Sequence, residues 1–468
     1  MKKKYSRLVN NSLVFAVGNF GSKLMSFIMV PIYSYTLSTS DYGKVDLLTS
    51  LVSLLMPIVC LDIYDSIFRF ALDKEENKAQ IFTTGTVFAF ITSIVTILVG
   101  SIFSLFIKDY PIEYTVLYMV VSVFYSLVSN FVRAVGHVRP FALAGIVNTF
   151  IMGGCNILFL VVSKLGMNGY MLSMILGQAA AIVYLTIATK LKTYFIWGDF
   201  NKQSLKEMLI YGIPLIPNNL AWWLNSASDR FFILGILGAS ANGIYAMANK
   251  IPGVITTMSS IFFQSWQMSV VEEYEKEDGK KFISSVFEAY ISILFFLGIG
   301  ILSLIRPIYR LILSAEYFQG WKLTPFLVLA VIYTSFASFL GTIYTANKKT
   351  TSVLVTTVYG AVANVVLTII LIKLIGIDGA ALANAFSFFI VSAIRFFEIK
   401  KLDKISLNIY KFVILHVLFG VITLTQLLSN NDLLVFGIGL VLLLVQLLVD
   451  DNLKNMLKSL NLKKLKNR

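Results

Sequence analysis

The chain has 468 residues, 57% of them hydrophobic and only 14% charged, with a formal net charge of +14. A soluble domain carries about 25% charged residues, so this composition excludes an ordinary soluble protein and predicts an all-α polytopic membrane protein. The apolar stretches are long and continuous, unlike the short alternating strands of a β-barrel. The sequence shows no basic face with interleaved aromatic residues, which argues against nucleic acid as a partner.

The apolar stretches are long enough for 14 membrane spans, since one span needs about 20 predominantly apolar residues. An even number of spans places both termini on the same side of the membrane. In chain order we expect the spans near residues 10–36, 43–69, 81–107, 112–133, 141–163, 168–189, 209–237, 242–270, 283–305, 322–346, 352–372, 378–397, 408–427 and 432–449.

The distribution of Lys and Arg predicts which side that is. Cytoplasmic loops carry an excess of these residues, so we expect both termini in the cytoplasm. With this orientation, most of the 39 Lys and Arg residues lie in internal loops and tails or at their edges. The cations that fall in outer loops are Lys108, Lys164, Arg306, Arg310, Lys322 and Lys373.

An internal repeat relates the two halves of the chain. The turn LSTSDYG at 37–43 recurs as LGASANG at 237–243, and KLGMNG at 164–169 matches KLIGIDG at 373–379. Each half contains six spans and starts on the same side, so the repeat is parallel and predicts two pseudo-symmetric six-helix bundles with a central cleft. Asn156 and Asn364 lie at matching positions in the spans before the second pair of turns.

The repeat predicts the organisation of the domains. We expect an N-terminal six-helix lobe at 1–190, a cytoplasmic linker at 191–207 and a C-terminal six-helix lobe at 208–398. Residues 399–449 hold a second cytoplasmic linker and two extra helices, spans 13 and 14. The basic cytoplasmic tail at 450–468 is either an amphipathic helix on the inner leaflet or disordered.

Ionisable residues are concentrated in the first two spans of each half. A charge at bilayer depth costs about 2.5–3.5 kcal/mol on insertion scales, so it usually faces a cavity or a partner. Arg230 and Lys250 lie about eight residues from the turn between spans 7 and 8, and therefore at one depth. Asp229 either pairs with one of these cations and locks the two helices together, or all three line the path of a cargo.

Polar residues continue the same faces of spans 7 and 8. A polar stripe of this length is unfavourable against lipid and reasonable against a water-filled cleft. The stripe of span 7 contains Asn218, Trp222, Asn225 and Asp229, and the stripe of span 8 contains Lys250, Gly253, Thr257, Ser260, Gln264 and Gln267.

Span 1 carries Lys23 near its middle, with Asn19 one turn away. An isolated ammonium at that depth needs an anionic partner, so we expect Lys23 to bind an anionic cargo or to pair with a carboxylate of span 2. Lys44 and Asp46 are either rim residues at the outer mouth or part of a gate.

Three further charges, Asp62, Asp65 and Arg69, share one face near the inner end of span 2. We expect them to form a salt-bridge cluster that closes the inner side of the protein. Such a cluster is compatible with a role in inner gating.

The sequence contains no Walker A, GxSxG, HExxH or paired CxxC motif, and its two cysteines lie inside spans. We therefore expect a transporter rather than an enzyme, with no cofactor and no metal site. Coupling of transport to a proton or sodium gradient stays open.

The order and spacing of several segments resemble the Wzx-type polysaccharide flippases of the multidrug/oligosaccharidyl-lipid/polysaccharide exporter superfamily. The resemblance covers nearly the whole chain, although each motif is weak by itself. The segments are LSTSDYG, LDIYDSIFRF, NSASDRFFILGILGASANGIYAMANKI, LILSAEYFQGW, and the openings of spans 6 and 12, GMNGYML and GIDGAAL.

The resemblance implies a V-shaped pair of six-helix bundles with a central cavity and alternating access. It implies translocation of undecaprenyl-pyrophosphate-linked oligosaccharide repeat units from the inner to the outer leaflet of the bacterial plasma membrane, for surface polysaccharide biosynthesis. Its implied partners are this substrate, membrane lipids, a polysaccharide polymerase and glycosyltransferases. Carried onto this chain, the pyrophosphate-facing cations are Lys23, Arg230 and Lys250.

Three alternatives remain. A multidrug/cation antiporter of the same superfamily usually has an acidic residue in span 1, whereas this span 1 holds Lys23 and no Asp or Glu. A lipid II flippase also has fourteen spans, but its cavity is rich in arginine. A non-transporting scaffold of a polysaccharide-assembly complex would be a protein of a different class.

Overall fold

The computed structural model describes residues 25–73, 75–274, 276, 278–347, 350–402, 405–451 and 453–454. Within these ranges the chain is helical and contains no strand. The contacts divide the chain into two compact units, one ending at Ala227 and one beginning at Ser228. The elements between the predicted lobes, at 191–207, therefore belong to the first unit.

The first unit starts with a helix at residues 25–36. Its further helices are α2 (Thr39–Val59), α3 (Ile63–Leu72), α4 (Lys78–Phe106), α5 (Ile112–Ala134), α6 (Val138–Asn156), α7 (Gly166–Ala188), α8 (Lys202–Gly212) and α9 (Ile216–Ala227). Short helical turns are η1 (Ile157–Val162), which continues α6, and η2 (Leu191–Tyr194) and η3 (Ile213–Leu215).

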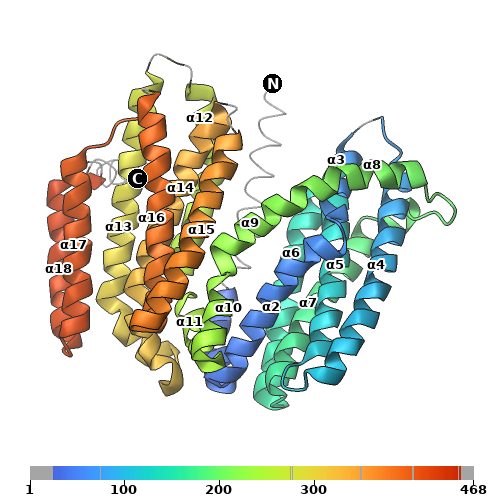
Figure 1. Ribbon diagram of the computed structural model, residues 1–468, viewed down its shortest axis with the longest axis horizontal. Helices are drawn as coiled ribbons and strands as arrows, with labels where there is room; N and C mark the ends of the chain where they lie inside the picture. Colours follow the sequence, from blue (N-terminus) through green and yellow to red (C-terminus); the bar gives the residue numbers. More distant parts are fainter. Residues whose placement is uncertain are drawn as a thin grey trace, which may run out of the picture. The chain divides into compact units, whose positions relative to one another are not determined.

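The second unit contains α10 (Asp229–Leu237), α11 (Ala239–Ala248), α12 (Gly253–Glu273), α13 (Gly279–Ile312), η4 (Ala315–Lys322), α14 (Thr324–Ala346), α15 (Thr350–Ile375), α16 (Ile377–Lys401), α17 (Ile409–Leu428) and α18 (Asp432–Val449). Helices α12 to α16 run side by side in this unit (Figure 1).

Within the described ranges, 11 helices are long and apolar enough to cross a membrane. They coincide with expected spans 2 to 6 and 9 to 14. Span 1 begins outside the described residues, and spans 7 and 8 are each divided into shorter helices. The total of fourteen spans and the symmetry between the halves therefore stay predictions.

Prolines lie at two of the divisions within spans 7 and 8, whereas the division between α9 and α10, at Ser228, contains none. Pro214 and Pro217 lie between α8 and the body of α9, and Pro252 directly precedes α12. Proline has no backbone N–H and its ring clashes with the preceding turn, so it favours a kink or an end of an α-helix. Within the described part of span 8, the segment Gly253–Phe263 of α12 is apolar but shorter than a full membrane span.

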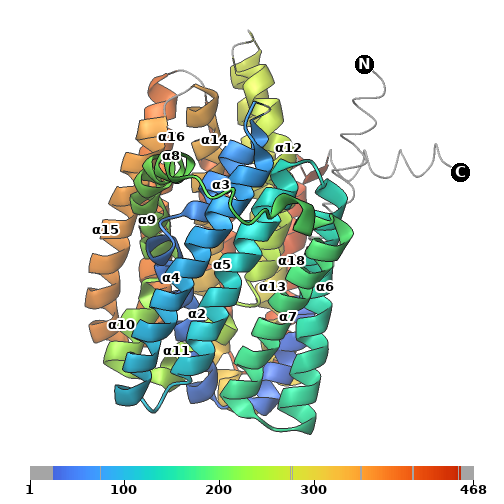
Figure 2. The same ribbon diagram turned by 90° about the vertical axis from the view of Figure 1, so that its right-hand side faces the viewer.

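Span 2 is also interrupted, between α2 and α3. Leu61 and Asp62 have φ angles of 48° and 55°, a left-handed conformation that costs about 1–3 kcal/mol for such residues. Helix α8 lies across the ends of α3 and α4 (Figure 2) and packs against this break. The Ser66 hydroxyl donates to the Met208 carbonyl at 2.7 Å, and a Cβ added to Gly212 would lie 2.7 Å from the Leu61 carbonyl oxygen.

A buried arginine joins three helices of the second unit. Arg395 of α16 is 3% exposed and donates from Nη1 to the Ala337 carbonyl of α14 at 2.6 Å. On α15 it donates to the Val353 carbonyl at 3.2 Å and to the hydroxyls of Thr356 and Thr357 at 2.9 and 3.0 Å. The guanidinium thus binds backbone and hydroxyl oxygens at the junction of α14, α15 and α16.

The last two helices form a hairpin that is bonded to α13 at two levels. At one end, Arg306 of α13 donates to the Ser429 carbonyl at 2.6 Å and lies 3.6 Å from the Asp432 carboxylate. Further along, the Gln446 amide of α18 donates to the Ser292 carbonyl at 2.8 Å. Figure 1 shows α17 and α18 alongside α13, and these contacts make the hairpin part of the second unit.

Replacing Arg395 by Met should destabilise the protein, because it leaves buried carbonyl and hydroxyl oxygens without their charged donor. Hydrogen bonds to a charged group contribute about 1.5–3 kcal/mol each, so we expect a loss of about 3 kcal/mol or more in the free energy of unfolding. Lys400→Met, at an exposed position of the same helix, is the matched control. Denaturant titration of the detergent-solubilised variants measures their free energies of unfolding. Equal stability of Arg395→Met and Lys400→Met would contradict the role of Arg395.

Candidate functional site

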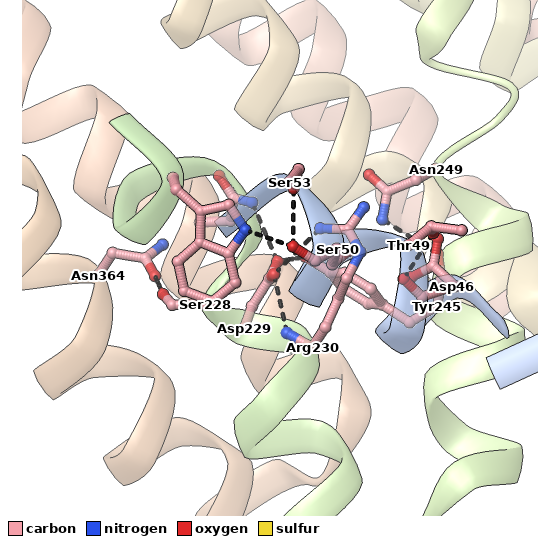
Figure 3. Close-up of polar contacts among 12 residues, drawn as sticks. Asp46, Thr49, Ser50, Ser53, Ser228, Asp229, Arg230, Tyr245, Asn249 and Asn364 are labelled. Carbon is pink, nitrogen blue, oxygen red and sulfur yellow. Dashed lines mark hydrogen bonds and ion pairs between the residues drawn. The ribbon is translucent and has the colours of Figure 1, made fainter. Parts of the chain in front are cut away.

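A buried carboxylate lies at the beginning of α10. Asp229 is 2% exposed, and the Tyr245 hydroxyl of α11 donates to its Oδ2 atom (Figure 3). The Asn384 amide of α16 donates to the same oxygen at 3.4 Å, and Arg230 Nη1 lies 3.6 Å from the Oδ1 atom. The carboxylate therefore links α10 to both α11 and α16.

The two asparagines of the internal repeat make comparable contacts, each within its own unit. Asn156 is fully buried, and its amide donates to the Tyr33 hydroxyl of span 1 at 2.9 Å. Asn364 of α15 is also buried, and it accepts a hydrogen bond from Ser228 at the start of α10 at 3.4 Å (Figure 3). Asn364 also donates to the Ser387 hydroxyl of α16 at 3.2 Å. In each unit the repeat asparagine thus bonds to the first span of that half.

Lys250 is placed differently from the other two charges of spans 7 and 8. It lies in the turn between α11 and α12 and is half-buried. Among the described residues, no hydrogen bond or ion pair engages its ammonium, whereas Arg230 pairs with Asp229. Asp229 therefore pairs with Arg230 rather than with Lys250, and the positive charge of Lys250 remains in excess.

The polar stripe of span 8 lies on the exposed side of α12. Ser260 is exposed and Thr257 half-exposed, while Ile255 and Ser259 are buried on the opposite side. The hydroxyls of Thr257 and Ser260 donate within the helix, to carbonyls at 2.9 and 2.8 Å, so their lone pairs remain as acceptors. On α9, Asn225 is buried, and its Oδ1 atom has no hydrogen-bond partner among the described residues.

Three candidates of the sequence analysis cannot be placed. Lys23 and Asn19 lie outside the described residues, and the side chain of Gln264 is not among those described. Their contribution to a binding site stays a prediction.

The expected salt-bridge cluster of Asp62, Asp65 and Arg69 is wrong. Asp62 accepts a hydrogen bond from the Asn219 amide at 3.1 Å, and Asp65 accepts one from the Asn130 amide at 3.2 Å. Arg69 is exposed, and no ion pair engages it within the described part of the chain. The carboxylates are bound by neutral amides of α9 and α5, while Arg69, four residues after Asp65 on the same helix, is exposed.

The remaining gating candidates, Lys44 and Asp46, lie near the beginning of α2. Lys44 Nζ donates to the Asp109 carbonyl in the loop between α4 and α5 at 3.3 Å, and it lies 5.4 Å from the Tyr110 ring centre. Asp46 is half-buried and interacts with another residue of the chain. Lys44 thus links the start of α2 to the loop between α4 and α5.

Sequence reasoning missed Tyr245 and Asn384 as partners of Asp229. Tyr245 could have been found, because Gly238 lies about midway between it and Asp229 and places both at a similar depth of the helical hairpin. No local signal points to Asn384, which lies more than a hundred residues further along the chain.

The candidate residues of the second unit combine cations, hydroxyl acceptors and a buried carboxylate. Within the described residues, no group of three or more His, Cys, Asp and Glu side chains could hold a metal ion. What the site offers is the Lys250 ammonium, the acceptor oxygens of Thr257 and Ser260, and the buried network around Asp229 that holds α10 and α11 in position.

A family model and a curated relative both match this chain. A family model described as "Polysaccharide biosynthesis protein" matches residues 8–270, more than half of the chain. Protein 1 of the Lsg locus of Haemophilus influenzae is 23% identical over 288 residues, which cover 59% of this chain and 68% of that protein.

Two solved structures share the fold at low sequence identity. A lipid II flippase, MurJ, in an inward closed conformation matches with a TM-score of 0.71 at 14% identity, over 93% of this chain and 98% of that one. An inward-facing multidrug resistance MATE family transporter of the MOP superfamily matches with a TM-score of 0.63 at 15% identity, over 83% and 99% of the two chains.

Asp229 and Lys250 should respond differently to removal. Asp229→Ala removes the acceptor of the Tyr245 hydroxyl and of the Asn384 amide, and one partner of the Arg230 cation, so we expect a loss of about 3–5 kcal/mol of stability and less protein in the membrane. Lys250→Ala removes no contact within the described residues. It should leave the stability and the amount of protein in the membrane unchanged. Thermal unfolding in detergent and membrane immunoblots measure these effects, and a stable Asp229→Ala variant would refute the structural role of the carboxylate.

Proposed function

Because the chain belongs to the family of polysaccharide biosynthesis proteins, we propose that it translocates undecaprenyl-pyrophosphate-linked oligosaccharide repeat units from the inner to the outer leaflet of the bacterial plasma membrane. The fold that it shares with a lipid II flippase and a MATE transporter supports a transport function. Lys250 is the observation that carries the proposal, because a cation without an ion-pair partner suits an anionic cargo.

In the proposed binding mode, cations of the protein bind the pyrophosphate of the cargo, and polar side chains bind its sugars. Lys250 binds the pyrophosphate as a compact point charge, and Lys23 supplies a second cation from span 1. Arg230 contributes less, because it shares its charge with Asp229. The acceptor oxygens of Thr257 and Ser260 on the exposed side of α12 suit sugar hydroxyls, which are hydrogen-bond donors.

Transport in this proposal is alternating access, by rocking of the N-terminal half against the C-terminal half. The sequence repeat assigns residues 1–190 and 208–398 to the two moving bodies. The division of contacts after Ala227 supports the addition of α8 and α9 to the first body. Both termini are cytoplasmic in this arrangement, as the distribution of Lys and Arg predicts.

Lys250→Ala and Lys23→Ala should each lower the amount of surface polysaccharide severalfold, because each removes a cation proposed to bind the pyrophosphate. The measurement is surface polysaccharide per cell in a deletion strain that carries each variant, with protein level checked by immunoblot. Lys373→Ala, at an exposed end of α15, is the control and should behave as the unaltered protein. Normal polysaccharide in both test variants would reject the assignment of these cations.

A lipid II flippase is the second candidate, because the match to a lipid II flippase structure covers 93% of this chain. Expression in cells depleted of their own lipid II flippase separates the two functions. We expect no restoration of growth, since we propose that the cargo is a polysaccharide repeat unit. Restored growth would favour lipid II. If loop substitutions abolished polysaccharide export and no substitution near Lys250 affected it, a scaffold role would be favoured instead.

A further inference from the structure

An apolar cavity lies within the first unit, between α2, α4 and α5, whereas Asp229 and Lys250 belong to the second unit. Its volume is about 640 Å³. Its wall includes Leu48 and Val52 of α2, Val99 of α4, and Val116 and Met119 of α5. All three helices qualify as membrane spans, so the medium around this unit is lipid hydrocarbon.

The few polar groups in the wall are already satisfied. The hydroxyls of Thr92, Thr96 and Thr115 donate to carbonyls of their own helices at 3.1, 2.7 and 2.9 Å. The wall therefore offers a water molecule almost no free hydrogen-bonding group. Because a water in a cavity needs two to four polar partners, an apolar occupant is favoured over water.

The cavity is open toward the lipid side of α4. Val95, Val99 and Phe103 line it, and they are 54%, 47% and 54% exposed. At about 30 Å³ per chain atom, similar to the share of a water molecule in the liquid, the volume holds roughly 20 chain atoms. That is the size of a single acyl chain, whereas a polyprenyl chain is much longer.

A second, polar cavity of about 400 Å³ adjoins the apolar one at the loop between α4 and α5. The two share Ile107 and Ile112 in their walls. The polar cavity is lined by one cation, Lys108, and by two acidic residues, Asp109 and Glu113. An anionic group and a cationic group can therefore be bound side by side at the mouth of the apolar cavity.

We propose that the two cavities together bind one zwitterionic phospholipid. One acyl chain lies between α2, α4 and α5, the phosphate lies at Lys108, and the ammonium lies at Asp109 and Glu113. The lipid-linked cargo fits less well, because two carboxylates would repel its pyrophosphate. The bound lipid fills a space between α2 and the α4–α5 pair and so supports the packing of the first unit.

The position of the lipid can be tested with phosphatidylethanolamine that carries a photoreactive group on its acyl chain. In vesicles, we expect labelling of α4 and α5 residues that line the cavity. Val99→Trp fills the cavity and should lower this labelling severalfold, whereas Leu98→Trp, at the neighbouring lipid-facing position outside the cavity, should not. Equal labelling of the two variants would overturn the proposal, and thermal unfolding confirms that both are folded.

The head group can be tested with the same photoreactive chain on phosphatidylglycerol, which lacks the ammonium. We expect weaker labelling than with phosphatidylethanolamine, and Asp109→Asn combined with Glu113→Gln should abolish the difference. Labelling by both lipids to the same extent would overturn the zwitterion assignment. Displacement of either lipid by a polyprenyl phosphate at the same residues would overturn it in favour of the cargo.

Discussion

Hydrocarbon cannot form hydrogen bonds with a backbone amide or carbonyl, so every interruption of a membrane helix needs polar partners inside the protein. The chain meets this constraint at the break before α3, where Ser66 and Asp62 contact α8 and α9. It meets the same constraint at the α9–α10 junction, where Ser228 and Asp229 contact α15, α11 and α16. Asp62 and Asp229, which are unfavourable at membrane depth, therefore stabilise interrupted helices. Lys250 makes no such contact among the described residues.

Neutral amides are the recurrent partners in both units. Asn219 and Asn130 donate to buried or half-buried carboxylates in the first unit, and Asn384 does so in the second. An amide satisfies a carboxylate oxygen without adding a second ion that must be desolvated. Among the described residues, no cation contacts Asp62 or Asp65, whereas Asp229 has Arg230 beside it.

The sequence predicts the long helices well because their apolar runs begin and end where the helices do. Span 10, expected at 322–346, is α14 at Thr324–Ala346, and span 14, expected at 432–449, is α18 at Asp432–Val449. The breaks are harder to predict, since the break between α2 and α3 lies within a run that stays apolar on both sides. The depth of Asp229 could be predicted from the turn, but Asn384 could not, because its position depends on how α16 packs against α10.

The contacts of Arg395 have a consequence for a protein exposed to different pH on the two sides of a membrane. Arginine stays protonated at any physiological pH, and its partners here are carbonyl and hydroxyl oxygens, which do not titrate. Acidification therefore leaves these four hydrogen bonds of Arg395 unchanged. They persist across a pH difference between the two sides of the membrane and hold α14, α15 and α16 at one point of contact.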